Sequence, residues 1–142
     1  MRIALLSDIH GNLPALEAVL ADLERAQPDR VVNLGDVALM GPQPHETVER
    51  LRALGYPTIL GNTDDKLLRS AAMQAAGDTS GSEPGEPSEP DDARRSRENG
   101  EWSAGQLTAD DQAYLRSFVP TLMRDLGEGQ TLLCCHGSPR SY

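Results

Sequence analysis

The fold of this chain is decided near its N-terminus, by the stretch Ile3-Ala4-Leu5-Leu6-Ser7-Asp8-Ile9-His10-Gly11-Asn12. Its first residues after Arg2 are apolar, and a short continuous apolar run is typical of a buried strand. A carboxylate and an imidazole then stand two positions apart, at Asp8 and His10, where that strand should end. Ligands of α/β proteins bind beyond the carboxyl ends of strands. The stretch therefore predicts a metal site at the edge of a sheet.

Three further clusters of oxygen or nitrogen ligands each follow an apolar run of their own. They are Gly35-Asp36, Gly61-Asn62-Thr63-Asp64 and His136-Gly137-Ser138. Because the carboxyl ends of parallel strands meet at one edge of a sheet, we expect the four clusters to form a single site.

The rest of the sequence indicates alternating strands and helices. An amphipathic helix, with Asn12 as its N-cap, is expected between the first two strands. We expect strands at 3–6, 31–34, 57–60 and 131–135, and further helices at 44–54, 67–75 and 114–118. The β-α-β-α-β order predicts an α/β fold with a parallel sheet.

The composition changes between 77 and 100, where Gly, Ser, Pro, Glu, Asp and Arg dominate. Almost no side chain there could bury apolar area, so we expect a disordered acidic surface insertion at about 77–100. A charged docking segment for a partner is the alternative. Order is expected to return at Trp102, and the residues from Thr108 to Asp111 have the pattern of a capping box.

Length and charge limit the classes of function. A chain of 142 residues predicts one domain over 1–142, and the formal net charge of −9 argues against a dedicated nucleic-acid or anionic-membrane surface. No apolar stretch approaches the roughly 20 residues of a membrane span, and the N-terminus lacks the pattern of a secretory signal. Cys134 and Cys135 are adjacent and poorly placed to pair, which favours a reducing compartment. We expect a cytoplasmic protein.

The ligand types predict a dinuclear metal centre. Two divalent cations about 3.5–4 Å apart can clamp a phosphoryl group and supply a hydroxide nucleophile at neutral pH. Asp36 is the best candidate for the bridging carboxylate, with Asp8 and His10 on one side and Asn62 and His136 on the other. Oxygen donors mixed with imidazole suit Mn, Fe or Zn better than a purely oxygen-coordinated cation. We expect two divalent ions, Mn before Fe, Zn, Ni or Mg.

Together these pieces resemble the calcineurin-like metallophosphoesterase family, and most of all its small bacterial and archaeal phosphodiesterase branch. The family signature runs Asp-x-His, Gly-Asp, Gly-Asn-His followed by Asp or Glu, a later His, and Gly-His-x-His. The matches stand at Asp8-Ile9-His10, Gly35-Asp36, Gly61-Asn62 with Asp64, and His136. The resemblance implies an αββα sandwich with two metals at the sheet edges, and hydrolysis of a small phosphoester by metal-bound hydroxide.

The resemblance also implies roles for single residues. The ligands to the first metal would be Asp8 and His10, the bridge Asp36, and the ligands to the second metal Asn62 and His136. Catalytic contributions are expected from Asp64, which would orient its neighbours, and from Thr63, which stands where the family has a histidine. A threonine hydroxyl can donate a hydrogen bond to phosphate but cannot deliver a proton as imidazolium would. Weak turnover of substrates with poor leaving groups is therefore expected.

The second departure from the family is larger. The chain stops at Tyr142, and no Gly-His-x-His follows His136. We therefore expect a sandwich that is incomplete at the C-terminus, exposed apolar surface that a second copy of the chain could cover, and impaired activity.

The leading hypothesis is a metal-dependent phosphoesterase, and the alternative is a non-catalytic phosphate- or metal-binding module derived from the same fold. A phosphatase of the haloacid-dehalogenase type is disfavoured, because His10 stands where that type has a second Asp. His45 is interpreted as a surface residue near the start of a helix.

Overall fold

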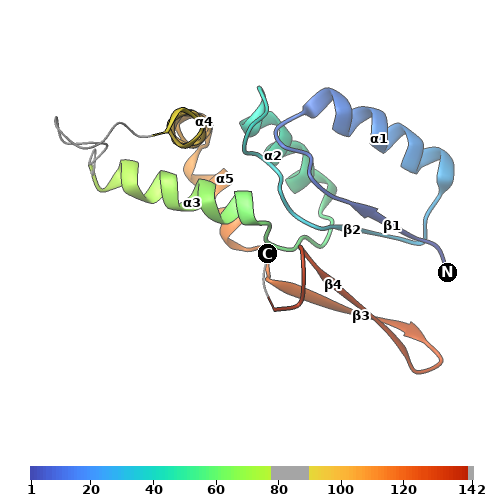
Figure 1. The fold of residues 1–142 in the computed structure, drawn as a ribbon. Coiled ribbons are helices and arrows are strands. Elements are labelled where there is room, and N and C mark those ends of the chain that lie inside the picture. Colours follow the sequence, from blue (N-terminus) through green and yellow to red (C-terminus); the bar gives the residue numbers. More distant parts are fainter. Residues whose placement is uncertain (78–89, 141–142) are drawn as a thin grey trace.

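The computed structural model describes residues 1–77 and 90–140 of the chain. The elements, in chain order, are β1 (Ile3–Leu6), α1 (Leu13–Ala26), β2 (Arg30–Asn33), α2 (Pro44–Leu54), α3 (Asn62–Ala75), α4 (Asp91–Gln106), α5 (Ala109–Arg116), β3 (Thr121–Gly127) and β4 (Gln130–Cys135). In Figure 1, α1 and α2 lie on one side of β1 and β2, and the β3–β4 hairpin lies on the other. The mixture of helices and short sheets confirms the predicted α/β class.

β1 and β2 form the parallel pair that the N-terminal stretch predicts. Ile3 lies opposite Arg30, and Leu6 opposite Asn33. The connecting helix α1 begins at the predicted N-cap, where the Asn12 side-chain oxygen accepts a hydrogen bond from the backbone N–H of the third residue after it. Satisfying a free N–H in this way fixes the start of a helix. The loop that carries Asp8 and His10 therefore has a defined strand before it and a defined helix after it.

The predicted strand at 57–60 forms only two isolated parallel bridges, from Thr58 to Asn33 and from Ile59 to Val119. Asn33 donates from its N–H to the Pro57 carbonyl at 2.9 Å and accepts from the Ile59 N–H at 3.0 Å. Proline has no N–H group, so Pro57 cannot donate a further hydrogen bond to β2, and the pairing is limited to this short contact. The segment still links β2 to the chain just before the hairpin.

β3 and β4 form an antiparallel hairpin in which Met123 lies opposite Leu133. β4 confirms the predicted strand at 131–135, whereas the sequence analysis did not predict β3. Gly127, Glu128 and Gly129 in the turn all have positive φ, a conformation that glycine adopts easily. Met123 and Leu133 are 66% and 45% exposed, so the chain shows apolar surface on this hairpin.

Residues Asp91–Gln106 form the helix α4, so the prediction of disorder over 77–100 is wrong for its last ten positions. Residues 78–89 of that predicted insertion lie outside the described residues. Two aspartates in the first turn of α4 complement the helix dipole. Arg94 pairs with Glu98 one turn later, and such pairs stabilise helices that have few apolar residues.

α4 packs against α3 through small residues. Gly100 is buried, and a Cβ atom there would meet the Ser70 hydroxyl at 3.0 Å.

The core of the protein is apolar and lies mainly among the helices. Its largest fully buried apolar side chains are Leu51, Ile59, Leu67, Leu115, Val32, Val37 and Val48. Within 1–77 and 90–140, no helix has the length and apolar character needed to cross a membrane.

Candidate metal centre

The loop after β1 and the loop after β2 are joined by backbone hydrogen bonds at the carboxyl ends of their strands. The Asp8 N–H donates to the Gly35 carbonyl at 3.1 Å, and the His10 N–H donates to the Asp36 carbonyl at 2.9 Å. Asp8, His10 and Asp36 have φ of 57°, 51° and 58°. Side-chain-bearing residues rarely adopt this left-handed conformation, and strain of this kind clusters at functional sites. Contacts between the loops therefore hold three predicted ligands in place.

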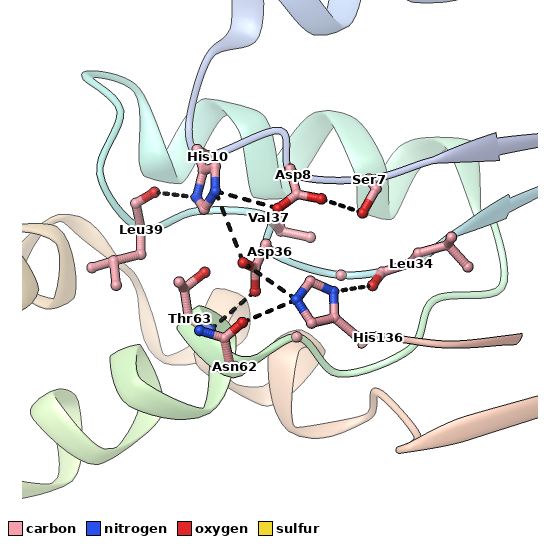
Figure 2. Close-up of polar contacts among 12 residues, drawn as sticks. Ser7, Asp8, His10, Leu34, Asp36, Val37, Leu39, Asn62, Thr63 and His136 are labelled. Atoms are coloured by element: carbon pink, nitrogen blue, oxygen red, sulfur yellow. Dashed lines mark hydrogen bonds and ion pairs between the residues drawn. The ribbon is translucent and has the colours of Figure 1, made fainter. Parts of the chain in front are cut away.

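The carboxylate of Asp36 lies between two imidazoles (Figure 2). Its Oδ2 is 3.8 Å from Nε2 of His10 and 3.5 Å from Nε2 of His136. Nε2 of His10 is also 3.7 Å from Oδ1 of Asp8. Among the described residues, Asp8, His10 and Asp36 offer ligand atoms that all lie within 4.8 Å of one another. Asp36 thus occupies the central position that a bridging carboxylate needs.

Both histidines are oriented by backbone carbonyls. Nδ1 of His10 is 3.0 Å from the Leu39 carbonyl oxygen, and Nδ1 of His136 is 2.8 Å from that of Leu34. A carbonyl can only accept, so each Nδ1 carries the proton and donates it. In the neutral ring Nε2 is then left with its lone pair, and Figure 2 shows both Nε2 atoms facing Asp36. Metal-binding histidines are typically held in this way by a hydrogen bond from the other ring nitrogen.

Asn62 completes the second side of the centre. Its Oδ1 lies 3.0 Å from Nε2 of His136, on the side of the ring that also faces Asp36. With the tautomer set by the Leu34 carbonyl, the amide oxygen and Nε2 are both acceptors, and a shared cation would satisfy both. Amide, carboxylate and imidazole donors together suit a transition metal. The structure thus brings all five predicted ligands together, and their chemistry fits metal ions.

Asp64 lies behind this centre and not in it. Its side chain is fully buried, and its carboxylate accepts from the N–H groups of Asp36 and Val37, both at 2.8 Å, and of Gly61 at 3.1 Å. Burial raises the pKa of Asp64 to about 6, although the backbone hydrogen bonds act to lower it. The residue holds the backbone of the central ligand, and this geometry supports the predicted orienting role.

Thr63 contacts the centre through its backbone. Its N–H donates to Oδ1 of Asp36 at 3.0 Å, which fixes the oxygen that does not face the histidines. Its hydroxyl is buried and has no hydrogen-bond partner among the described residues. No hydrogen bond to a described residue therefore competes for this hydroxyl, and its contact with phosphate stays a prediction.

Close backbone approach makes two glycines necessary. A Cβ atom on Gly61 would lie 2.1 Å from Oδ1 of Asp36. Gly35 has φ of 95°, and a Cβ atom on it would meet the Gly61 nitrogen at 2.5 Å. Both distances are far inside van der Waals contact, so a side chain at either position would push the loops apart.

Nothing in the sequence marks Leu34 and Leu39 as part of the site. Each contributes only its carbonyl oxygen, which every residue possesses, so the residue type carries no signal. Their side chains follow the apolar pattern of strand and core, and the tertiary structure alone shows their role.

Comparisons with known proteins identify the family of this chain. A model of the calcineurin-like phosphoesterase family matches residues 1–141. An uncharacterized protein of Methanocaldococcus jannaschii is 44% identical over 71 residues, which make up 50% of this chain and 29% of that protein.

Two solved structures share the fold. A metallophosphoesterase from Sphaerobacter thermophilus has 32% sequence identity and a TM-score of 0.60, over 87% of this chain and 44% of that one. A hypothetical protein from Pyrococcus horikoshii has 22% identity and a TM-score of 0.72, over 99% of this chain and 56% of that one. The chain therefore spans about half the length of these solved structures or less. Because the family model matches almost every residue, and the strand-end ligands have the order of the family signature, this chain belongs to the calcineurin-like phosphoesterase family of metal-dependent phosphoesterases.

Proposed function

We propose that this chain carries the centre of a phosphoesterase that hydrolyses a small phosphoester at two divalent cations, with manganese as the first candidate. The observation that carries the proposal is the position of Asp36, whose Oδ2 lies 3.5 and 3.8 Å from the Nε2 atoms of two histidines. One carboxylate oxygen between two imidazoles is what a bridged pair of cations requires.

The chain's own residues would divide the work as follows. Asp8 and His10 would hold one cation, Asn62 and His136 the other, and Asp36 would contact both. When bound, the cations neutralise charge on the phosphoryl oxygens and lower the pKa of water. The protein keeps its ligands in place through the carbonyl bonds to the histidines, so little reorganisation is needed when a substrate arrives.

Thr63 sets the expected range of substrates. No imidazole stands at this position to protonate a departing alkoxide, and a threonine hydroxyl can only donate a hydrogen bond. Turnover should therefore depend on the leaving group, with p-nitrophenyl esters hydrolysed much faster than alkyl esters. Equal turnover of the two ester types would contradict this assignment.

The central test is Asp36→Asn, with Asp22→Asn as the matched control, since Asp22 lies on the surface of α1 in a pair with Arg25. The assay is hydrolysis of bis-p-nitrophenyl phosphate with added Mn²⁺, together with calorimetric titration of Mn²⁺. We expect Asp36→Asn to lower the affinity for Mn²⁺ by about 10–100-fold and to reduce hydrolysis to background. Asp22→Asn should change neither. Unchanged Mn²⁺ affinity in Asp36→Asn would refute the proposal.

A second candidate function is a non-catalytic module that binds metal or phosphate. The observation that favours it is Thr63, because the side chain at this position cannot act as an acid towards the leaving group. This module would titrate with Mn²⁺ and lose that binding in Asp36→Asn, but it would give only background hydrolysis of bis-p-nitrophenyl phosphate. The same two measurements thus separate the two functions.

A further inference from the structure

A cavity of about 480 Å³ opens beside the candidate metal centre. Part of its wall is shared with the centre, since it includes Asn62, Thr63 and Leu39, whose carbonyl orients His10. The rest of the wall comes from Met40, from Lys66 near the start of α3, and from Arg95, Ser96 and Asn99 of α4, a helix that was not predicted from the sequence. A molecule bound at the metal centre would therefore extend directly into this cavity.

The packing of α4 on α3 fixes the far wall of the cavity. The buried glycine Gly100 permits a close approach to Ser70, as described above. The Gln74 side chain also donates from Nε2 to the Glu101 carbonyl at 2.7 Å, which joins the two helices beyond the cavity. Most of the cavity wall is thus formed by packed helices, and Leu39 and Met40 of the loop before α2 complete it.

Two cationic side chains line this cavity, and neither forms an ion pair with a residue that the structure describes. Lys66 donates from Nζ to the Ser96 hydroxyl, and Arg95 makes no ion pair with any residue in the described ranges. The flanking arginines of the same helix behave differently, since Arg94 and Arg97 both pair with glutamates. Two cations without an ion pair in the described part of the chain are unexpected where the formal net charge is −9. This arrangement indicates that the cavity attracts an anion.

Two polar atoms on the same wall are also without partners. The Thr63 hydroxyl and Oδ1 of Asn99 are buried and make no hydrogen bond to a described residue. Most buried polar groups in folded proteins are hydrogen-bonded, so each exception calls for an explanation. A ligand with several oxygen atoms would accept from the Thr63 hydroxyl, whereas the amide oxygen of Asn99 can only accept and would need a donor instead. The two cations and the Thr63 hydroxyl therefore point to the same kind of ligand.

We propose that this cavity binds a second phosphate group of the substrate, next to the phosphoryl group that reacts at the metal centre. Lysine and arginine side chains are the usual partners of phosphate in proteins. The inference rests on the proposed function and narrows its substrate class to compounds that carry two phosphoryl groups. Lys66, Arg95 and the Thr63 hydroxyl are the specificity-determining contacts.

The first test uses the full chain without metal, so that no cation at the metal centre can bind the phosphate. Inorganic phosphate is titrated calorimetrically in the presence of a chelator, into the wild type and into Lys66→Gln, Arg95→Gln and Arg94→Gln. We expect Lys66→Gln and Arg95→Gln each to weaken binding about tenfold, or about 1.4 kcal/mol. Arg94→Gln is the matched control and should bind as the wild type does, because Arg94 is paired with Glu98 and lies outside the cavity wall. Absent binding, or equal binding by all four proteins, would overturn the proposal.

The second test uses the chain with Mn²⁺ and compares two inhibitors of bis-p-nitrophenyl phosphate hydrolysis. Methylenediphosphonate should inhibit the wild type at least about tenfold more tightly than methylphosphonate, and the ratio should approach one in the Lys66→Gln/Arg95→Gln protein. If the ratio is the same in both proteins, the cavity does not bind a second phosphate. If there is no hydrolysis at all, the proposed function fails, and the metal-free titration still decides the cavity separately.

Discussion

The loops that hold the candidate ligands and the C-terminal hairpin are stabilised in opposite ways. The loops meet around a fully buried carboxylate, Asp64, which accepts three backbone N–H groups. The hairpin exposes the apolar pair Met123 and Leu133 and is held by its own strand ladder. Buried polar contacts between distant segments fix positions far better than an exposed ladder does. Yet the hairpin delivers His136, so the centre depends on both regions.

The most damaging substitution should be Asp64→Ala in the loop region. It leaves three buried N–H groups without an acceptor, and each unsatisfied group costs about 1–3 kcal/mol. We expect the free energy of unfolding to fall by about 3–5 kcal/mol, measured by urea denaturation. The control is Asp65→Ala, since Asp65 makes only a surface pair with Arg69 and should cost less than about 1 kcal/mol. Equal losses in the two variants would mean that the buried carboxylate does not stabilise the loops.

Gly61→Ala should come next, because it tests the spacing of the loops without removing any hydrogen-bonding group. Its Cβ atom would lie 2.1 Å from Oδ1 of Asp36, and relieving such a clash typically costs about 1–3 kcal/mol. Affinity for Mn²⁺ should fall with the stability, because the central ligand must move. Gly105→Ala is the control, since Gly105 lies in α4 and a Cβ atom on it would meet no other atom within 4 Å. That substitution should leave the free energy of unfolding unchanged or raise it slightly. A similar loss of stability in both variants would show that the loops move apart at little cost.

A smaller, pH-dependent effect is expected on the helical side of the molecule. Nδ1 of His45 lies 2.6 Å from Oδ2 of Asp111, which is fully buried. The hydrogen bond to Asp111 raises the pKa of His45. Burial alone would raise the pKa of Asp111, but hydrogen bonds from Thr108 and His45 bring it below its usual value. Both groups are therefore charged together over a wider pH range in the folded protein than in the unfolded chain.

The pH dependence of the free energy of unfolding follows from the directions of these two pKa shifts. The raised pKa of His45 gives stability that is present below the unfolded histidine value of about 6.5 and is lost as pH rises through the folded value. The lowered pKa of Asp111 gives stability that is lost as pH falls below about 4. We expect His45→Asn to lower the free energy of unfolding by about 0.5–1 kcal/mol at pH 5.5. The loss is small because solvent screens the charge of the partly exposed imidazole. At pH 8.5 the difference should shrink towards zero, and an equal difference at both pH values would rule out the charged pair.

Local signals in the sequence predicted the parts of the fold that depend on local chemistry. Asn12 accepts the capping bond from its helix, and Thr108 and Asp111 form the predicted capping box. Gly55 ends α2 in the left-handed conformation expected of a C-cap. The order of the ligands along the chain was also readable, because each follows an apolar run. The expectation that all these runs share one parallel sheet is wrong for β4, which precedes His136 and pairs antiparallel with β3 in a second sheet.

The parts that were not predicted depend on contacts between distant segments. α4 has few apolar residues and reads as a solvated segment, although its spaced Arg–Glu pairs and its two initial aspartates could have indicated a helix. The cavity wall carrying Lys66 and Arg95 was missed for the same reason. β3 was missed because Arg124 and Asp125 interrupt its apolar residues, and its register comes from β4 and the turn between them. The orienting carbonyls of Leu34 and Leu39 leave no trace in the sequence.

The smallest effect is expected from the exposed face of the hairpin. Met123→Thr/Leu133→Thr replaces an apolar cross-strand pair with residues that also favour strands, on a face that buries little area. The free energy of unfolding should change by no more than about 0.5 kcal/mol at low protein concentration, in urea denaturation. A loss above about 1 kcal/mol that grows with protein concentration would mean that a second copy of the chain covers this face. In that case the hairpin, and His136 with it, would be positioned by assembly, and the contrast between the two regions would hold only for the isolated chain.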